Sequence, residues 1–270
     1  MQRRLFLQKV SLLSSSLMAA PYLSFAKPGV QKAPGLKFIT ASDGHWGQPN
    51  TDFETSHRNL IEAISKEEHV DFVVFNGDLI HDKPELMPGV KKVYDTLKVP
   101  YYVARGNHDR VSPDAWLQIW KQPEDFAFIS KERHGIVLLS CSNETGKYLC
   151  ANVEFLKSKL EEFSMLPQVF VFVHISQNTW TQHGVPCAEL LDTITAYPNV
   201  KATFHGHDHD VDGIMLYKKK PFLWSGHFGG NWGNPFPSYR VCEIAEDGKS
   251  VVTYLKTVKD GTVLNKHNLQ

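Results

Sequence analysis

The stretch Phe204-His205-Gly206-His207-Asp208-His209 continues a largely apolar run, residues 200–204, and carries three histidines and an aspartate. The apolar run predicts a short buried strand that ends in a loop. Side chains two apart on an extended backbone point to the same side, so His207 and His209 can face one site. Gly206 allows the backbone to pass close to that site. Two imidazoles presented together favour a transition metal such as zinc, iron or manganese, although neighbouring histidines on a loop can also be simply solvated.

Four further polar clusters each follow a predicted strand. The strands cover residues 36–41, 70–75, 100–104 and 169–173. The clusters that follow them are Asp43-Gly44-His45, Gly77-Asp78, Gly106-Asn107-His108-Asp109 and His174. In open α/β sheets ligands bind at the carboxyl ends of the strands, so we expect the five clusters to meet at one edge.

The remaining elements predict the layers around these strands. Helical patterns cover residues 56–66, 90–97, 113–120, 152–163 and 188–196, a hairpin is expected at 126–129 and 136–141, and closing strands at 211–217, 221–225, 239–244 and 250–258. Alternating strands and helices followed by a meander predict either two packed sheets with helices outside, or one large mixed sheet.

The ligand types point to a pair of metal ions. Two ions about 3.5–4 Å apart can clamp a phosphoryl group for in-line displacement. Asp78 is the best candidate for the anionic ligand that touches both ions, and Asn107 would add a neutral amide oxygen, which keeps the site attractive to an anion. Taken singly, Asp43 could cap a turn and Asn107 could lie in one, because both residue types favour such places.

The ordered set D-x-H, G-D, G-N-H-D, H and G-H-x-H resembles the calcineurin-like metallophosphoesterase family, over about residues 36–258. The resemblance implies an α/β fold with a two-sheet mixed β sandwich flanked by helices, in four αββα layers. It implies one metal held by Asp43, His45, Asp78 and His209, and a second held by Asp78, Asn107, His174 and His207.

The resemblance also implies a mechanism. A metal-bound hydroxide would attack phosphorus, and the catalytic residue His108, which lies outside the metal set, would stabilise charge or protonate the leaving oxygen. Asp109 is expected to orient His108. The sequence departs from many family members at Ile175-Ser176, which follow His174 where a further His or Pro is usual, and this leaves that side of the pocket undefined.

The expected activity is metal-dependent phosphoric ester hydrolysis. The region 36–258 has no obvious inserted cap and is similar to the branch that acts on phosphodiesters, including cyclic nucleotides. A phosphomonoesterase or nucleotidase is the alternative, and a catalytically silent binding protein of the same fold is a third. The expected cofactors are two divalent or trivalent transition metal ions (Mn, Fe or Zn), and the expected partner is a small-molecule phosphate ester. A formal net charge of zero gives no reason to expect a nucleic acid polymer.

Residues 1–26 resemble a twin-arginine signal peptide. Arg3-Arg4-Leu5-Phe6-Leu7-Gln8-Lys9 is similar to the motif, with Gln2 where Ser or Thr is usual and Gln8 where Lys is usual, and Ser24-Phe25-Ala26 matches a small-x-small cleavage site. The segment predicts export by the twin-arginine translocation machinery to the periplasm of a bacterial cell, with an uncleaved membrane anchor as the alternative.

For the cysteines and the other histidines, the sequence predicts a location more readily than a function. Cys141 and Cys242 lie in apolar runs and are expected in the core, although Cys141 and Cys150 could close a small loop in an oxidising compartment. His81 and His205 flank predicted ligands, and His227 in a Gly-rich loop could wall the substrate pocket or merely fill the loop. The remaining histidines, expected at the surface or in the core, are His57, His69, His134, His183 and His267.

Overall fold

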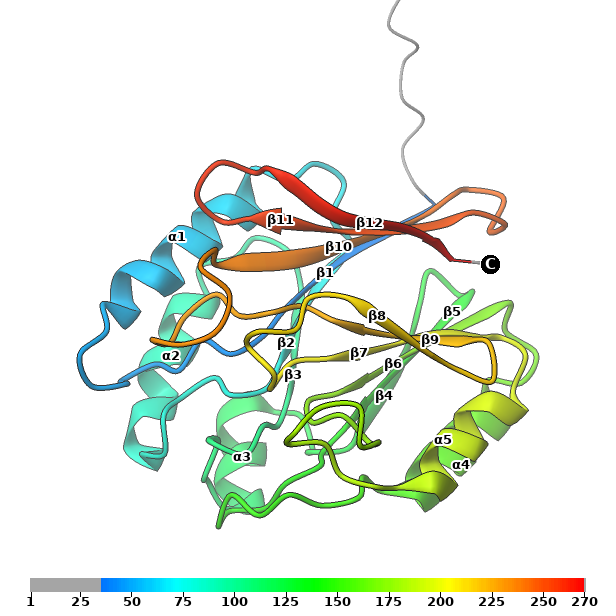
Figure 1. The fold of residues 1–270 in the computed structure, drawn as a ribbon, viewed down its shortest axis with the longest axis horizontal. Helices are drawn as coiled ribbons and strands as arrows, with labels where there is room; N and C mark the ends of the chain where they lie inside the picture. Colours follow the sequence, from blue (N-terminus) through cyan, green and yellow to red (C-terminus); the bar gives the residue numbers. More distant parts are fainter. Residues whose placement is uncertain (1–34, 270) are drawn as a thin grey trace, which may run out of the picture. The chain divides into compact units, whose positions relative to one another are not determined.

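The computed structural model of the protein describes residues 35–269, in which the strands form two six-stranded sheets (Figure 1). The first sheet contains, in spatial order, β12 (Val263–Leu269), β11 (Val251–Thr257), β10 (Ser238–Ile244), β1 (Leu36–Ala41), β2 (Phe72–Asn76) and β3 (Tyr101–Ala104). The second contains β4 (Phe126–Ser130), β5 (His134–Leu139), β6 (Gln168–Val173), β7 (Val200–His205), β9 (Lys220–Trp224) and β8 (Ile214–Tyr217). The twin-arginine-type segment, residues 1–26, lies outside the described residues.

Each sheet has a parallel centre and antiparallel edges. Strands β1, β2 and β3 run parallel, as do β5, β6, β7 and β9, whereas β10 to β12, β4 and β8 pair antiparallel with their neighbours. The central strands are buried along their whole length, as expected for apolar runs covered on both faces. The carboxyl ends of the parallel strands therefore meet at one edge, which is where the predicted ligands follow.

Five α-helices and one short 3₁₀ turn lie among the described residues. They are α1 (Phe53–Ser65), the 3₁₀ turn η1 (Pro84–Leu86), α2 (Met87–Tyr94), α3 (Pro113–Trp120), α4 (Val153–Glu162) and α5 (Ala188–Ala196). Three of the helices begin at a side-chain cap, because Asp52, Ser112 and Asn152 accept hydrogen bonds from the backbone N–H three residues on, at 3.1, 3.3 and 3.0 Å. None of the helices within residues 35–269 has the length and apolar character needed to cross a bilayer.

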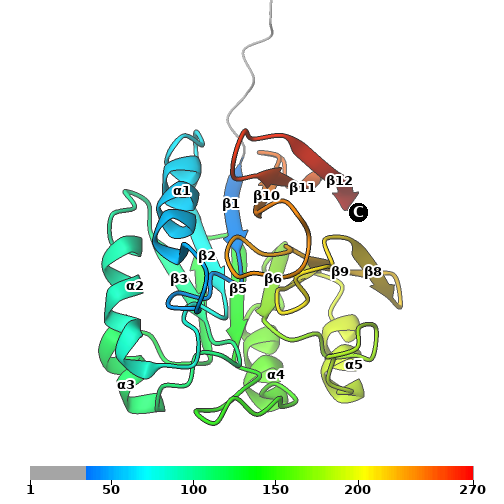
Figure 2. The same cartoon turned by 60° about the vertical axis from the view of Figure 1, so that its left-hand side comes forward.

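The apolar cores define four layers. Helices α1, α2 and α3 pack against the outer face of the first sheet, and α4 and α5 pack against the outer face of the second (Figure 2). Between the sheets lies an aromatic interior, in which the ring of Phe38 is 5.2 Å from that of Phe72 and 5.2 Å from that of Phe170. The predicted αββα sandwich is confirmed, and the alternative of one large sheet is wrong.

Several element bounds differ from the sequence predictions. Helix α2 covers Met87–Tyr94 instead of residues 90–97, because Pro88 is tolerated in a first turn, where its missing N–H is not needed. Strand β8 starts at Ile214 instead of residue 211, since Val211 N donates to Asp208 O in a turn. The sequence predicted no strand after residue 258, yet β12 adds an edge strand to the first sheet.

The disulfide joins Cys150 to Cys187, with Cα atoms 5.4 Å apart, so the pairing of Cys141 with Cys150 is wrong. Cys141 is fully buried beyond the end of β5, and its sulfur accepts the backbone N–H of Ile175 at 3.1 Å. Its side chain therefore belongs to the apolar core around α4 and α5. Cys242 is buried in β10, as predicted.

Candidate metal centre

All seven predicted ligands follow strands at the carboxyl edge of the two sheets, and the six carboxylate and imidazole ligands lie in two adjoining groups. Asp43 and His45 follow β1, Asp78 follows β2, Asn107 follows β3, His174 follows β6, and His207 and His209 follow β7. All seven side chains are buried. Burying so many polar groups is costly unless they are paired or coordinate a cation, which marks this edge as a functional site.

The backbone at this edge is strained. The φ angles of Asp43, His45, Asp78 and His207 are 61°, 47°, 52° and 68°, in the left-handed region that costs a non-glycine residue about 1–3 kcal/mol. Backbone hydrogen bonds hold the first two loops against each other, because the N–H groups of Gly44 and His45 both reach the carbonyl oxygen of Asp78 at 3.0 Å. These backbone bonds and φ angles fix the direction in which the ligand side chains leave the loops.

Two glycines permit the close approach of these loops. A Cβ atom on Gly106 would clash with the carboxylate and backbone nitrogen of Asp78, and one on Gly206 would clash with Ser42 and Asp43. Neither contact could relax without moving a predicted ligand or its neighbour. The glycines of the G-N-H-D and G-H-x-H motifs are therefore required by packing against the carboxylates.

The ligand atoms form two adjoining groups of three, Asp43 with His45 and His209, and Asp78 with His174 and His207, and within each group they lie within 4.8 Å of one another. In the first, Nε2 of His209 is 3.2 Å from Oδ1 of Asp43 and 3.0 Å from Nε2 of His45. In the second, Nε2 of His174 is 3.2 Å from Oδ2 of Asp78. Oδ2 of Asp78 is also 3.8 Å from Nε2 of His45, and Oδ1 of Asp43 is 3.8 Å from Nε2 of His174, so both carboxylates face both groups.

The donor set fits transition-metal ions. Among the described residues, Nε2 of His174, Nε2 of His207 and Oδ1 of Asn107 are buried without a hydrogen-bond partner. Leaving such groups unsatisfied costs about 1–3 kcal/mol each, and a cation would satisfy them. Nδ1 of His174 donates to the Asn76 carbonyl at 2.7 Å, which leaves its Nε2 lone pair facing the carboxylates. Nδ1 of His209 makes the same kind of bond to the Trp232 carbonyl at 3.2 Å.

The electrostatics of the site favour a cation. Burial opposes ionisation of Asp43, but the attraction of His174 and His209 outweighs it and lowers the pKa of Asp43 to about 2. The pKa of Asp78 likewise lies well below its usual value, because His174 and His108 overcome the effect of burial. Burial would lower the pKa of His174, yet Asp78 and Asp43 raise it to about 10. The attraction between His174 and the two carboxylates reflects the excess of buried negative charge at this edge, which a bound cation would balance.

His108 lies at the same edge but is oriented by a different residue from the one predicted. Its Nδ1 donates to Oδ1 of Asp82 at 2.9 Å, and Nε of Arg110 donates to the same oxygen at 3.0 Å. The carboxylate of Asp109 instead accepts the backbone N–H groups of Leu79, Ile80 and Gly106 at 2.8, 3.1 and 2.8 Å. The prediction that Asp109 orients His108 is therefore wrong, since this buried carboxylate fastens the two loops together.

The histidines that were not predicted as ligands make different contacts near the site. Nδ1 of His81 lies 3.1 Å from Nδ1 of His45. The ring of His227 stacks on that of His209, with centroids 4.8 Å apart, and Trp232 also stacks on His209 at 3.9 Å. His205 is fully buried and its Nδ1 donates to the Val173 carbonyl at 2.8 Å, so it belongs to the core.

A cavity of about 220 Å³ opens onto the two groups. It is lined by His45, Asp78, His108, Tyr148, His183, His207, His209 and Trp232. Sequence reasoning missed Tyr148 and Trp232 and assigned His183 to the surface or core. Their rings come from loops far apart in the sequence, and only the Gly- and aromatic-rich composition around Trp232 gave a signal.

Comparison with known proteins identifies a family and similar folds. The family model described as calcineurin-like phosphoesterase matches residues 36–211. The fold is similar to that of a dimetal phosphatase from Danio rerio, with a TM-score of 0.69 and 13% identity, covering 88% of this chain and 99% of that one. It is also similar to Yfce, a phosphoesterase from E. coli, with a TM-score of 0.49 and 11% identity, covering 87% of this chain and 100% of that one. No curated protein matches the sequence.

The family match covers more than half of the chain, and the two His/Asp groups indicate a dimetal site. A hydrolase that uses metal ions to cleave phosphoric esters accounts for the buried carboxylates, the unpaired imidazole nitrogens and the adjoining cavity. The chain belongs to the calcineurin-like phosphoesterase family and is a metal-dependent phosphoric ester hydrolase.

Proposed function

We propose that the protein hydrolyses a small-molecule phosphodiester with two transition metal ions. The supporting observation is the pair of adjoining His/Asp groups, with Oδ2 of Asp78 3.8 Å from Nε2 of His45 across them, which open into one cavity. Asp43, His45, Asp78 and His209 would hold one ion, and Asp78, Asn107, His174 and His207 the other. When bound, the ions would polarise the phosphoryl oxygens and lower the pKa of a bound water. The mixed nitrogen and oxygen donors suit Mn, Fe or Zn.

The protein groups orient the site and set its charge. Asp43 and Asp78 supply two negative charges, while Asn107 and the imidazoles add neutral donors. Divalent ions would therefore leave the centre net positive and attractive to a phosphate ester. The carbonyls of Asn76 and Trp232 hold the rings of His174 and His209 and direct their Nε2 atoms toward the metal positions.

His108 is the proposed general acid. It lines the cavity and lies outside the two groups, and its Nδ1–H is held by Asp82. This hydrogen bond leaves Nε2 available to give a proton to the leaving oxygen or to stabilise charge on the phosphoryl group. Arg110 holds Asp82 from the other side and keeps that carboxylate in place.

The cavity lining favours a diester over a monoester. Among the residues that the structure describes, no lysine or arginine lines the cavity. A phosphodiester carries one negative charge, which two metal ions can balance, whereas a monoester dianion would gain from a further cation. Cyclic nucleotides are one class of compact diester that suits such a site. A phosphomonoesterase and a catalytically silent binding protein are the competing functions.

Activity assays separate these alternatives. Metal-loaded protein should hydrolyse bis(p-nitrophenyl) phosphate and cyclic nucleotides faster than p-nitrophenyl phosphate, measured as kcat/KM. Asp78→Asn is the matched control for contaminating activity. A higher kcat/KM on the monoester would favour the phosphomonoesterase, and binding without turnover of any ester would favour the silent protein.

We also propose export through the twin-arginine route with cleavage after Ala26. The motif Arg3-Arg4 and the triplet Ser24-Phe25-Ala26 support it, as does the Cys150–Cys187 disulfide, since such bonds persist in oxidising compartments. Replacing both arginines with lysine should leave the protein in the cytosol. Periplasmic recovery of that variant would contradict the route, and an intact Met1 on exported protein would contradict the cleavage.

A further inference from the structure

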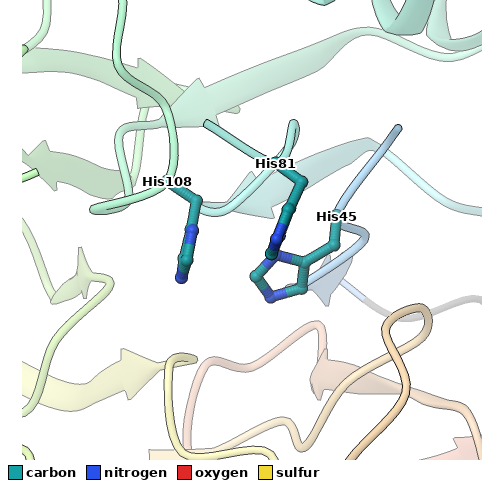
Figure 3. Close-up of side chains that lie close together, drawn as sticks. All are labelled: His45, His81 and His108. Atoms are coloured by element: carbon teal, nitrogen blue, oxygen red, sulfur yellow. The ribbon is translucent and has the colours of Figure 1, made fainter. Parts of the chain in front are cut away.

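Three imidazoles, those of His45, His81 and His108, lie side by side at one end of the site (Figure 3). The rings of His81 and His108 stack with centroids 4.9 Å apart and planes 10° apart. The ring of His45 meets that of His81 nearly edge-on, at 5.2 Å and 67°. His81 therefore contacts both a predicted ligand of the first group and the predicted catalytic histidine.

The backbone fixes His81 between these two residues. Trp46 N donates to Leu79 O, and His81 N donates back to Trp46 O, each at 3.0 Å. On the other side, Asp82 N donates to His108 O at 3.1 Å. The segment that carries His81 is thus bonded to the segments that carry His45 and His108, and it cannot shift without disturbing both.

The contact with His45 is a hydrogen bond that sets a tautomer. Nδ1 of His45 and Nδ1 of His81 are 3.1 Å apart, so one must donate and the other accept. Nε2 of His45 faces the carboxylates of the site and needs its lone pair there, so His45 donates from Nδ1 and His81 accepts. The backbone carbonyls of Asn76 and Trp232 do the same for His174 and His209. For His45, the imidazole of His81 takes the place of such a backbone carbonyl.

The contact with His108 is through the ring face. Stacking by His81 and the bond from His108 Nδ1 to Asp82 act on the same imidazole, and they come from consecutive residues. Stacking fixes the plane of the ring, and the hydrogen bond fixes its rotation within that plane. Together they determine where Nε2 of His108 points.

A third metal ion among the three imidazoles is the competing explanation. It would require His45 to lose its remaining ring proton and bridge two ions as an imidazolate, and Nδ1 of His108 already donates to Asp82. We propose that His81 is a positioning residue, which holds His45 in its metal-binding tautomer through Nδ1 and holds His108 against the leaving group through its ring face. The inference rests on the proposed function.

The two contacts can be separated by substitution. His81→Asn keeps an acceptor near the position of Nδ1 but has no ring, whereas His81→Phe keeps the ring face but has no acceptor. His81→Ala removes both, and His69→Asn, at an exposed histidine with a φ of 59°, is the matched control. Bound metal is measured by elemental analysis after dialysis against graded chelator, and kcat is measured on alkyl and nitrophenyl diesters.

The expected results differ for each variant. His81→Phe should weaken retention of one of the two ions by about 10- to 100-fold, the usual effect of losing such a partner. His81→Asn should keep both ions but slow alkyl esters more than nitrophenyl esters, since only the former depend on a well-placed acid. His81→Ala should show both losses, and His69→Asn neither.

Four outcomes would overturn the inference. If wild-type protein binds two ions and is active, and the His81 variants retain the same metal and the same rates, the proposed function stands but His81 has no positioning role. Equal losses of metal and rate in the Phe and Asn variants, with a lowered melting temperature, would make His81 merely structural. Three ions per wild-type chain, falling to two in every His81 variant, would assign a third metal site. Wild-type protein that binds no metal would overturn the proposed function and this inference with it.

Discussion

Oδ2 of Asp78 lies 3.2 Å from Nε2 of His174, although the two residues are at the ends of strands in different sheets. The same carboxylate oxygen is 3.8 Å from Nε2 of His45, and Oδ1 of Asp78 accepts the backbone N–H of His108 at 2.8 Å. Asp78 therefore contacts both ligand groups and the segment of His108, whereas Asp43, whose Oδ1 is 3.8 Å from Nε2 of His174, approaches both groups without that link to His108.

Asp78→Asn should empty at least one of the two metal positions. An amide has one neutral oxygen donor where the carboxylate offers two charged ones, so it cannot serve both groups. Elemental analysis of the purified variant should give fewer than two ions per chain, against two for wild type. Two retained ions in the variant would show that another residue connects the groups.

The buried histidines should make the protein less stable in acid. Burial lowers the pKa of His205 to about 4, compared with about 6.5 in an unfolded chain. Between pH 6.5 and pH 4 the unfolded state therefore binds a proton at this residue that the folded state does not, and stability is lost as the pH falls through that window. The loss amounts to at most about 1.4 kcal/mol per pH unit for one such residue.

His205→Phe tests this contribution, because His205 stacks on Phe222 and a phenyl ring can occupy the same space. Urea unfolding at several pH values should show a shallower fall in the free energy of unfolding between pH 6.5 and pH 4 for the variant than for wild type. Only this difference isolates His205, since Asp109, whose pKa is raised to about 7 by burial and by Asp78, acts in the opposite direction. Parallel curves would contradict the assignment.

The ligands could be predicted from the sequence because each follows a strand, and parallel strands bring their carboxyl ends to one edge. Asp82 could not be predicted in the same way. It orients His108 only because the backbone bond from Asp82 N to His108 O draws two loops together. Tyr148 and Trp232 reach the cavity through irregular loops with no periodic pattern, so their contribution appears only in the folded chain.

The Cys150–Cys187 disulfide likewise could not be predicted from the sequence. The two cysteines are 37 residues apart, and their contact depends on where the loop after β5 meets the start of α5. Cys141 is closer to Cys150 in the sequence and was therefore the suggested partner, but its side chain is buried in the core. Strand β12 was missed because its sequence, Val-Leu-Asn-Lys-His-Asn-Leu, is mostly polar, as an exposed edge strand can be.

Breaking the Cys150–Cys187 disulfide should lower stability by about 2–4 kcal/mol, because it closes a long loop in the unfolded chain. The double variant Cys150→Ser, Cys187→Ser should unfold at a lower urea concentration than wild type. Reductant should shift the wild type toward the variant and leave the variant unchanged, which controls for other effects of the reagent. A wild-type midpoint that does not respond to full reduction would show that the bond does not contribute.

His108→Ala should keep both metals and lose rate selectively. His108 donates a proton only if its Nε2 reaches the leaving oxygen, and general acid catalysis contributes about 10²–10⁴-fold. An alkoxide leaving group, as in a cyclic nucleotide, needs that proton, whereas a nitrophenolate leaves well without it. The variant should therefore lose most of its kcat/KM on alkyl diesters and much less on nitrophenyl diesters.

Asp82→Asn provides the companion to this experiment. An asparagine can still accept the Nδ1–H of His108 through its amide oxygen, but a hydrogen bond to a neutral amide is weaker than one to a carboxylate and holds the ring less firmly. We expect a smaller loss than for His108→Ala, again larger on alkyl than on nitrophenyl diesters, with both metals retained by elemental analysis. If both substrates slow by the same factor in both variants, His108 acts by stabilising phosphoryl charge, and its role as general acid is wrong.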